Sequence, residues 1–270
     1  NLFYNALYKG GFYMLINIKN KKLNVIMNNE VIDLPSELKE KINSNFKEMQ
    51  QNGANVWNGE VLCVSEYKIE NETLNMICKK SNYAHYLYGE HIGCPKEYEC
   101  KNLSAGCLIE TLDGFYVVGE LADHTSYPTM IQVTGGGIDK LDITDNNINI
   151  LQTILREAKE ELNLDLTNNT LVVNNEISYM YISEKNEQPG VQFFSKAKIN
   201  MTAKEFNSYF EKYYKYLKEN NLEIEFSKLH FIHKENVEET LKKLDNPKRN
   251  YLMPLLLEDS KEKKIIKHNP

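Results

Sequence analysis

The alternation of apolar and polar positions divides this chain into many short strands and a few amphipathic helices. Runs of four to eight residues that are apolar or alternate with period two predict strands, and apolar residues at i, i+3, i+4 predict helices. Strands are predicted at 15–18, 23–27, 61–69, 74–80, 105–110, 116–119, 130–133, 171–173, 177–182, 191–197 and 223–233. Helices are predicted at 36–51, 151–162, 203–220 and 236–244. The first two strands are expected to form a hairpin.

A polar loop near Lys101 separates two groups of these elements. The pattern therefore predicts a small α+β domain at 14–100 and a larger domain at 101–270. Residues 1–13 are aromatic and contain glycine, without the charged, apolar and small-residue regions of a signal peptide. We expect Met14 to be the natural start and residues 1–13 to be foreign to the protein or disordered.

Composition limits the kinds of partner that this protein can have. The chain has 270 residues, 41% of them hydrophobic, and 38 acidic against 32 basic residues give a net charge of −6. An acidic chain offers no electrostatic case for binding structured nucleic acid. No apolar run approaches the roughly 18 residues that a membrane span needs. We therefore expect a soluble, cytoplasmic protein that binds no membrane, and the oligomeric state is left open.

The cysteines and two neighbouring histidines give no pattern typical of a metal site. The five cysteines, at 63, 78, 94, 100 and 107, form no Cys-x-x-Cys pair, so reduced thiols are expected. His230 and His233 lie three residues apart in a predicted strand. Alternate strand residues point to opposite faces, so these two rings are not expected to share a metal.

Residues 156–161, with the sequence Arg-Glu-Ala-Lys-Glu-Glu, are the most informative segment for function. A helix advances 100° per residue, so Glu157, Glu160 and Glu161 share one face of the predicted helix. Clustered carboxylates repel one another unless a cation offsets their charge. Carboxylate oxygens are the ligands that hard divalent ions such as Mg²⁺ prefer. The alternative is a solvated acidic face on which Arg156 and Lys159 form local ion pairs.

The segment upstream of this helix favours the functional interpretation. The residues Thr134-Gly135-Gly136-Gly137 follow the predicted strand at 130–133. Three consecutive glycines permit backbone conformations that other residues rarely adopt. A strand, a glycine turn, a loop and an acidic amphipathic helix together form a more specific pattern than any one of them alone.

These residues resemble the signature of the Nudix hydrolases, which places Gly, five residues, Glu, seven residues and then Arg-Glu-aliphatic-x-Glu-Glu-x-Gly-aliphatic. Here Gly136 is followed after five residues by Asp142 in place of Glu, and thirteen residues, 143–155, precede Arg156 instead of seven. Ala158 is smaller than usual, and Asn163 stands where Gly is expected. Asn is the next most tolerant residue for the left-handed conformation that ends a helix.

The resemblance implies a fold and a set of site residues. The fold would be α+β, an α/β/α Nudix sandwich with a mixed β-sheet, preceded by the small N-terminal domain. Catalysis would depend on Arg156, Glu157, Glu160 and Glu161, with Mg²⁺, or alternatively Mn²⁺, held by the three glutamates and Gly136. Asp142 is a weaker metal candidate because of the insertion, and a general base is sought among Glu176, Glu184 and Glu187.

The resemblance also implies a reaction, although it leaves the substrate-binding residues open. Family members cleave the diphosphate of a nucleoside diphosphate linked to another group, and such a small molecule is the expected partner. The layout of an α+β region before the core looks like Nudix proteins that hydrolyse UDP-glucose and UDP-galactose to UMP and sugar 1-phosphate. The alternative is a non-catalytic Nudix domain that senses a nucleotide metabolite.

Overall fold

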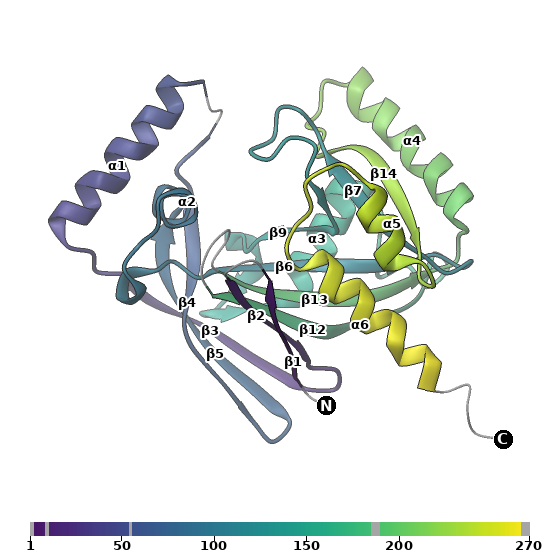
Figure 1. The fold of residues 1–270 in the computed structure, drawn as a ribbon, viewed down its shortest axis with the longest axis horizontal. Helices are drawn as coiled ribbons and strands as arrows, with labels where there is room; N and C mark the ends of the chain where they lie inside the picture. The colour runs from purple at the N-terminus through teal and green to yellow at the C-terminus, as the bar shows by residue number, and fades with distance from the viewer. Residues whose placement is uncertain (1–2, 9–10, 54–55, 185–189, 266–270) are drawn as a thin grey trace. The chain divides into compact units, whose positions relative to one another are not determined.

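The computed structural model describes residues 3–8, 11–53, 56–184 and 190–265. Its helices and its parallel and antiparallel strand pairs form an α+β fold with mixed sheet pairing, which confirms the predicted fold class (Figure 1). The chain divides into two compact units, each made of several segments. Unit 1 comprises Asn1–Ala105, Gly136–Thr153 and Ser178–Phe193, and unit 2 comprises Gly106–Gly135, Ile154–Ile177 and Phe194–Pro270. The boundary predicted between residues 100 and 101 stays a prediction.

Unit 1 contains seven complete strands among its described residues. They are β1 (Phe3–Tyr8), β2 (Gly11–Asn17), β3 (Lys22–Val31), β4 (Glu60–Glu70), β5 (Thr73–Asn82), β10 (Ile143–Thr144) and β11 (Asn147–Ile148). β4 and β5 form an antiparallel hairpin across the polar turn at 71–72, as the sequence predicts. β3 runs parallel to β5 on its other side. The bounds of β4 and β5 extend the predicted strands by one or two residues at each end.

One expectation about the start of the chain is wrong. The predicted hairpin between the strands at 15–18 and 23–27 does not form, because β2 pairs instead with β1 and with β12 (Val172–Glu184). Leu15, Ile16 and Ile18 are all buried, and neighbours on both edges supply that burial better than a two-stranded hairpin does. β1 and the first residues of β2 fall within the segment 1–13, whose origin stays a prediction.

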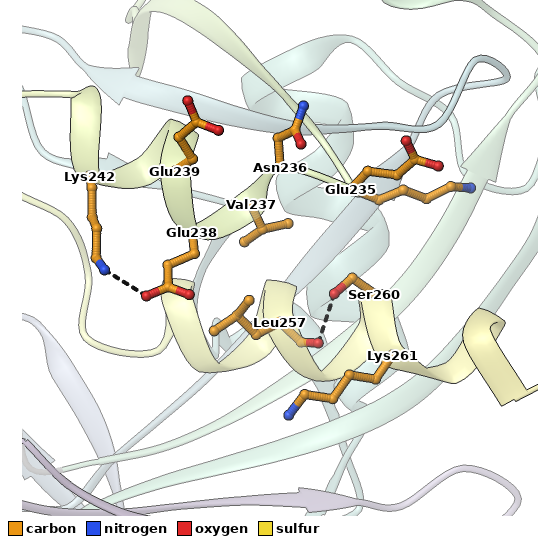
Figure 2. Close-up of a pocket in the computed structure, with 10 residues that line it drawn as sticks. Glu235, Asn236, Val237, Glu238, Glu239, Lys242, Leu257, Ser260 and Lys261 are labelled. Carbon is orange, nitrogen blue, oxygen red and sulfur yellow. Dashed lines mark hydrogen bonds and ion pairs between the residues drawn. The ribbon is translucent and has the colours of Figure 1, made fainter.

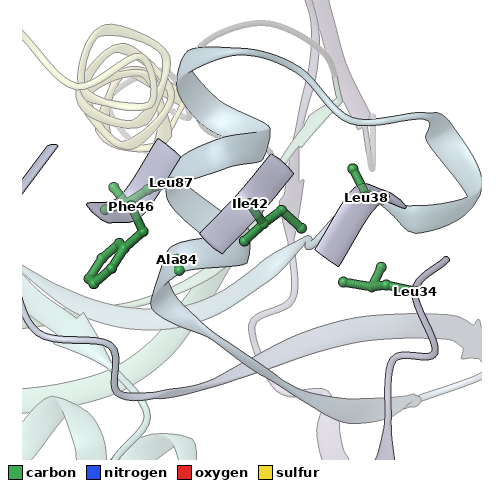
Figure 3. Packing of buried hydrophobic residues seen from close by; sticks show 6 residues of the cluster. All are labelled: Leu34, Leu38, Ile42, Phe46, Ala84 and Leu87. Atoms are coloured by element: carbon green, nitrogen blue, oxygen red, sulfur yellow. The ribbon is translucent and has the colours of Figure 1, made fainter. Parts of the chain in front are cut away.

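Two helices of unit 1 pack on each other through an apolar cluster. α1 (Ser36–Gln51) matches the predicted helix, and α2 (Tyr83–His91) was not predicted from the sequence. Asn82 caps α2 by accepting a hydrogen bond from the His85 amide. Figure 3 shows the cluster, to which α1, the preceding loop and α2 contribute Leu34, Leu38, Ile42, Phe46, Ala84 and Leu87.

The extra residues between the glycine turn and the acidic helix form a small β-hairpin. β10 and β11 pair across Asp145 and Asn146, whose φ angles of 48° and 65° are those of the two-residue turn that suits hairpins. β11 then pairs with β3, and the Met27 amide donates to the Asn146 carbonyl at 2.8 Å. The insertion is therefore an ordered element that adds an edge to the strands of unit 1.

A disulfide joins Cys63 and Cys100, with their Cα atoms 5.3 Å apart, so the expectation of five reduced thiols is wrong. Cys63 lies on β4 opposite Asn102, which brings together two cysteines 37 residues apart. This register depends on tertiary pairing and leaves no local signature. Disulfides are rare in reducing compartments, so the bond does not support the expected cytoplasmic location.

Unit 2 contains a hairpin and a third strand that carry its sheet. β6 (Asn102–Glu110), which begins in unit 1, pairs with β7 (Phe115–Leu121) as predicted, and β7 pairs on its other edge with β14 (Phe226–His233). The short β8 (Ile131–Gln132) also pairs with β7 and precedes β9 (Thr134–Gly137). The remaining elements are α3 (Ile150–Leu162), β13 (Gly190–Ile199), α4 (Ala203–Glu219), α5 (Val237–Lys243) and α6 (Leu252–Ile265).

The helix α6 was missed by the sequence analysis, and a buried ionic network holds it. Asp259, 1% exposed, accepts hydrogen bonds from Tyr116 on β7 and from Lys196 on β13, each at 2.6 Å. Lys196 and Lys234 also pair with Glu110, which is equally buried. Both carboxylates of this network, Glu110 and Asp259, thus have a cationic partner, which offsets the cost of burying their charge. Within the described residues, no helix has both the length and the apolar character that crossing a bilayer would need.

His85 in α2 is fully buried, and its hydrogen bonds fit the neutral form of the ring. Its Nδ1 lies 2.7 Å from the Ser81 hydroxyl, and its Nε2 lies 2.7 Å from the Tyr98 carbonyl. A carbonyl only accepts, so Nε2 carries the proton and Nδ1 accepts from Ser81. Burial lowers the pKa of His85 below its usual value.

As pH falls through about 6.5 toward the lower pKa of folded His85, this histidine is protonated in the unfolded chain but not yet in the folded one. The free energy of unfolding should therefore decrease over this pH range. Urea unfolding from pH 7.5 to 5 should show that the difference in unfolding free energy between wild type and H85Q shrinks as pH falls. The exposed His91 at the end of the same helix supplies a matched control, H91Q, whose profile should follow that of wild type. Parallel profiles for wild type and H85Q would contradict this account.

Candidate functional site

The helix α3 forms where the sequence predicts it, with defined signals at both ends. Asn149 precedes it and accepts a hydrogen bond from the Gln152 amide, which caps the first turn. Ile154, Ala158 and Leu162 are almost completely buried and define the apolar face. Leu151, in the first turn, is 40% exposed.

The last turn of α3 ends at a left-handed residue and is covered by tyrosines of α4. Asn163 has a φ of 54°, as predicted for the position where glycine is usual. The last carbonyls of a helix lack partners within it. The Tyr213 hydroxyl donates to the Glu160 carbonyl and the Tyr209 hydroxyl donates to the Asn163 carbonyl, both at 2.7 Å. These bonds fix the turn that carries the acidic residues.

Glu161 is held by the strand and glycine turn upstream of α3. Its Oε2 accepts hydrogen bonds from the Thr134 hydroxyl and, at 3.0 Å, from the Gly135 amide. Gly135 has a φ of 148°, which side chains rarely permit. A Cβ at Gly106 would come within 2.7 Å of the Thr134 carbonyl, so that glycine lets the turn lie close to β6. The predicted link between glycine turn and acidic helix is thus a direct contact.

The other two glutamates of the motif share one arginine. Arg156 donates from one terminal nitrogen to Glu157 at 2.7 Å and to Glu160 at 3.2 Å. The side chains of Arg156 and Glu157 are mostly buried, whereas that of Glu160 is 60% exposed. The three carboxylates therefore differ: Glu161 is locked, Glu157 is held by Arg156, and Glu160 has room to move.

Burial and mutual repulsion make Glu157 and Glu161 difficult to ionise. Burial raises the pKa of Glu157 to about 7, against the opposing effect of Arg156 and with a further contribution from Glu160. Burial and the charge of Glu157 raise the pKa of Glu161 well above its usual value. Cations near such a cluster would favour the ionised forms and remove this cost.

The charge of a fourth acid, Glu225, acts on this cluster, and this residue was not identified from the sequence. It lies immediately before β14, and its charge contributes to the raised pKa of both Glu157 and Glu161. Burial raises its own pKa, while His124 and Arg249 oppose that rise. The sequence places Glu225 within a predicted strand far from the motif, so no local signal connects it with α3.

The remaining predicted candidates occupy separate positions. Gly136 follows Gly135 in β9 and is half-buried. Asp142 is buried, and its carboxylate accepts from the Asp139 amide and the Thr153 hydroxyl, both at 2.9 Å, which is a structural role. Glu176 is half-buried in β12, Glu184 ends that strand, and Glu187 lies outside the described residues.

His230 and His233 engage different partners, in keeping with their predicted separation. The His230 ring lies 2.8 Å from the Glu120 carboxylate, and the His233 ring packs edge-on against Phe115. Both partners lie on β7, the strand antiparallel to β14.

The donor chemistry of the acidic cluster fits a hard divalent cation. All its members offer carboxylate oxygens, which suit Mg²⁺ better than softer metals. In the described part of the chain, no three His, Cys, Asp or Glu side chains already have the spacing of a metal site. Arg156 occupies Glu157 and Glu160 in this arrangement, so cation binding would require the exposed Glu160 to turn away from Arg156.

A separate cavity of about 540 Å³ lies between α5 and α6 (Figure 2). Its lysines are already matched by acids: Lys242 pairs with Glu238 at 2.6 Å and Lys234 pairs with Glu110 at 3.0 Å. Its walls contain no residue of the acidic cluster. The cavity is therefore a weaker candidate for the functional site than the acidic cluster is.

No family model matches the chain, and no curated protein matches it. Solved structures similar to it include a Nudix hydrolase from M. smegmatis, RenU, with 12% identity over 62% of this chain and 88% of that chain and a TM-score of 0.37. The pyrophosphohydrolase BsRppH of Bacillus subtilis has 15% identity over 59% and 81% of the two chains, with a TM-score of 0.36. A MutT protein from Methanosarcina mazei has 11% identity over 60% and 94%, with a TM-score of 0.36. Similarities at this level carry no argument about function.

The tyrosines of α4 allow a test of how the acidic turn is fixed. Y213F removes the hydroxyl that donates to the Glu160 carbonyl, at a cost of about 1 kcal/mol for one hydrogen bond. Melting temperature should fall by about 2–4 °C, and amide exchange should accelerate in the last turn of α3. Tyr216 is exposed and stacks on Tyr213, so Y216F is the matched control. Equal exchange in Y213F and Y216F would show that the hydroxyl does not restrain this turn.

Proposed function

We propose that this protein is a Mg²⁺-dependent hydrolase that cleaves the diphosphate of a nucleoside diphosphate linked to another group. The observation that carries the proposal is the locking of Glu161 by Thr134 and Gly135. It joins the glycine turn to a helix face on which Glu157 and Glu160 also lie. A buried carboxylate cluster with this cost of ionisation is poorly explained as a structural feature alone, because unpaired buried charge destabilises a fold.

In this proposal Glu160 and Glu161 hold the metal, with Glu157 assisting and the Gly136 carbonyl as a further predicted ligand. The metal supplies Lewis acidity toward the diphosphate oxygens and lowers the pKa of a bound water; Mn²⁺ could replace Mg²⁺. Arg156 orients Glu157 through a charged hydrogen bond of 2.7 Å. Its planar fork suits this role better than a lysine would.

A carboxylate from outside the helix is also part of the proposal. Glu225 is a stronger candidate than Glu176, Glu184 or Glu187 to accept a proton from the attacking water, because its charge acts on both Glu157 and Glu161. Attack of water on phosphorus breaks a bond within the diphosphate and leaves two phosphate monoesters. For a UDP-sugar, the substrate suggested by the layout of the chain, these products are UMP and sugar 1-phosphate.

The alternative function is a nucleotide sensor without catalysis. The observation that favours it is the lack, among the described residues, of three potential ligands at metal-site spacing. The motif opposes it, because all three helix glutamates are present together with the arginine that orients two of them.

The proposed metal ligands give the first test. The double variant E160Q/E161Q should keep its fold, since glutamine retains the shape of each side chain and removes the cost of burying the Glu161 charge. Its hydrolysis rate should fall on the order of 10²- to 10⁴-fold as the metal loses its position. E219Q on α4 is the control, because Glu219 is an exposed acid that pairs with Lys215 of the same helix. Hydrolysis by the double variant at the wild-type rate would mean that these residues are not the metal ligands.

The substrate is tested by competition. With Mg²⁺ and equal concentrations of UDP-glucose, ADP-ribose, ADP-glucose and 8-oxo-dGTP, we expect UDP-glucose to be consumed first, with UMP and glucose 1-phosphate as products. Chromatography of the mixture identifies the products directly. Preference for another compound would replace the UDP-sugar proposal and keep the hydrolase. Tight binding of one compound without turnover of any would favour the sensor.

A further inference from the structure

The chain contains only two arginines, Arg156 and Arg249, among its 32 basic residues. Arg156 is part of the acidic cluster, and the charge of Arg249 opposes the rise in the pKa of Glu225. The two arginines are 93 positions apart in the sequence. Arginine differs from lysine in its planar fork, which matches the geometry of a phosphate.

The backbone around Arg249 is fixed against β8. The Ile131 amide donates to the Pro247 carbonyl at 2.8 Å, and the Arg249 amide donates to the Ile131 carbonyl at 3.1 Å. Asn246 also donates from its side chain to the Thr129 carbonyl. These bonds lay the segment 246–249 alongside residues 129–131 as if it were a short added strand, with one parallel bridge at Lys248.

The side chain of Arg249 is fixed as well, and by neutral partners. Its Nε donates to the Gln132 side chain at 3.1 Å, and its guanidinium carbon lies 4.3 Å from the centre of the Tyr127 ring. Gln132 is buried, which fixes the acceptor. None of the hydrogen bonds in the described residues uses the terminal nitrogens of Arg249. Arg156 directs its charge to Glu157 and Glu160, whereas Arg249 has an amide and an aromatic ring as neighbours and no ion pair within the described chain.

Gln132 connects Arg249 to the acidic cluster through one short stretch of chain. Gln132 ends β8 and Thr134 begins β9, with only Val133 between them. One binds Arg249 and the other binds Glu161. On the other side, the Ala122 amide donates to the Glu225 carbonyl, which places the loop with His124 and Tyr127 next to that acid. Arg249 thus places a positive charge beside the acidic cluster, and Tyr127 places an aromatic ring there.

We infer that Arg249, supported by Gln132 and Tyr127, is a phosphate-binding residue that receives the diphosphate of an anionic ligand at the acidic cluster. This inference rests on the proposed function for the position of the diphosphate. Carboxylates repel a phosphate, and Arg156 is already paired with Glu157 and Glu160, so a second cation of the chain would offset this repulsion beside any metal. A guanidinium already held in place loses little entropy on binding and donates two parallel hydrogen bonds to phosphate oxygens.

The experiment is a calorimetric titration of the full chain with inorganic pyrophosphate in the presence of Mg²⁺. R249M should weaken binding roughly 10- to 100-fold, as expected for loss of a charged hydrogen-bond pair. R249K keeps the charge without the fork and should fall between wild type and R249M. Lys215 on α4 forms an exposed ion pair, so K215M removes one positive charge away from the site and should bind as wild type does.

Equal binding by R249M and wild type, or no binding by wild type itself, would overturn the inference. If R249M does not fold, R249Q replaces it, since glutamine can still donate to Gln132 but carries no charge. Loss of binding in R249Q at an unchanged melting temperature supports the inference, and unchanged binding overturns it. The titration measures binding of pyrophosphate and does not depend on hydrolysis. If the protein hydrolyses none of the substrates but binds pyrophosphate through Arg249, the hydrolase proposal is wrong and the inference about Arg249 stands.

Discussion

The hydrogen bonds from Thr134 and Gly135 to Glu161 are the contacts on which the arrangement of the site depends. A carboxylate that is almost completely buried costs several kcal/mol to ionise unless donors or cations surround it. The hydrogen bonds from Thr134 and Gly135 offset part of this free energy. They also fix the position of the last turn of α3. Gly135, whose amide is one of these donors, has a φ of 148°, a conformation that residues with a side chain rarely adopt.

Other features of unit 2 support that contact from different directions. The tyrosines of α4 occupy carbonyls at the end of α3, and the left-handed Asn163 ends the helix there. Arg156 restrains Glu157, and the neutral partners of Arg249 keep a positive charge beside Glu225. The result is a group of acids whose backbones are rigid while one side chain, that of Glu160, stays exposed. Rigid acids with one adaptable member suit a site that must adjust to a cation.

The sequence predicts those parts of the molecule in which local chemistry decides the outcome. The spacing of the glutamates predicts the acidic face of α3, and the tolerance of Asn for a left-handed conformation predicts how the helix ends. The sequence fails where distant segments decide. β2 and β3 look like a hairpin but pair elsewhere, Cys63 and Cys100 meet through strand register, and Glu225 reaches the cluster through tertiary packing. None of these has a periodic signature, since partners far apart in the chain determine them.

The hairpin β10–β11 shows how extra residues can be accommodated between the glycine turn and α3. β10 and β11 double back through a tight turn, and the Asn149 amide just before α3 donates to the Asp142 carbonyl at 2.8 Å. Chain length between the glycine turn and the helix can therefore vary without altering how α3 starts. A search pattern that fixes the number of intervening residues would overlook this arrangement. A pattern built from the contacts of Asp142, Thr134 and Glu161 would retain it, because those contacts do not depend on a residue count.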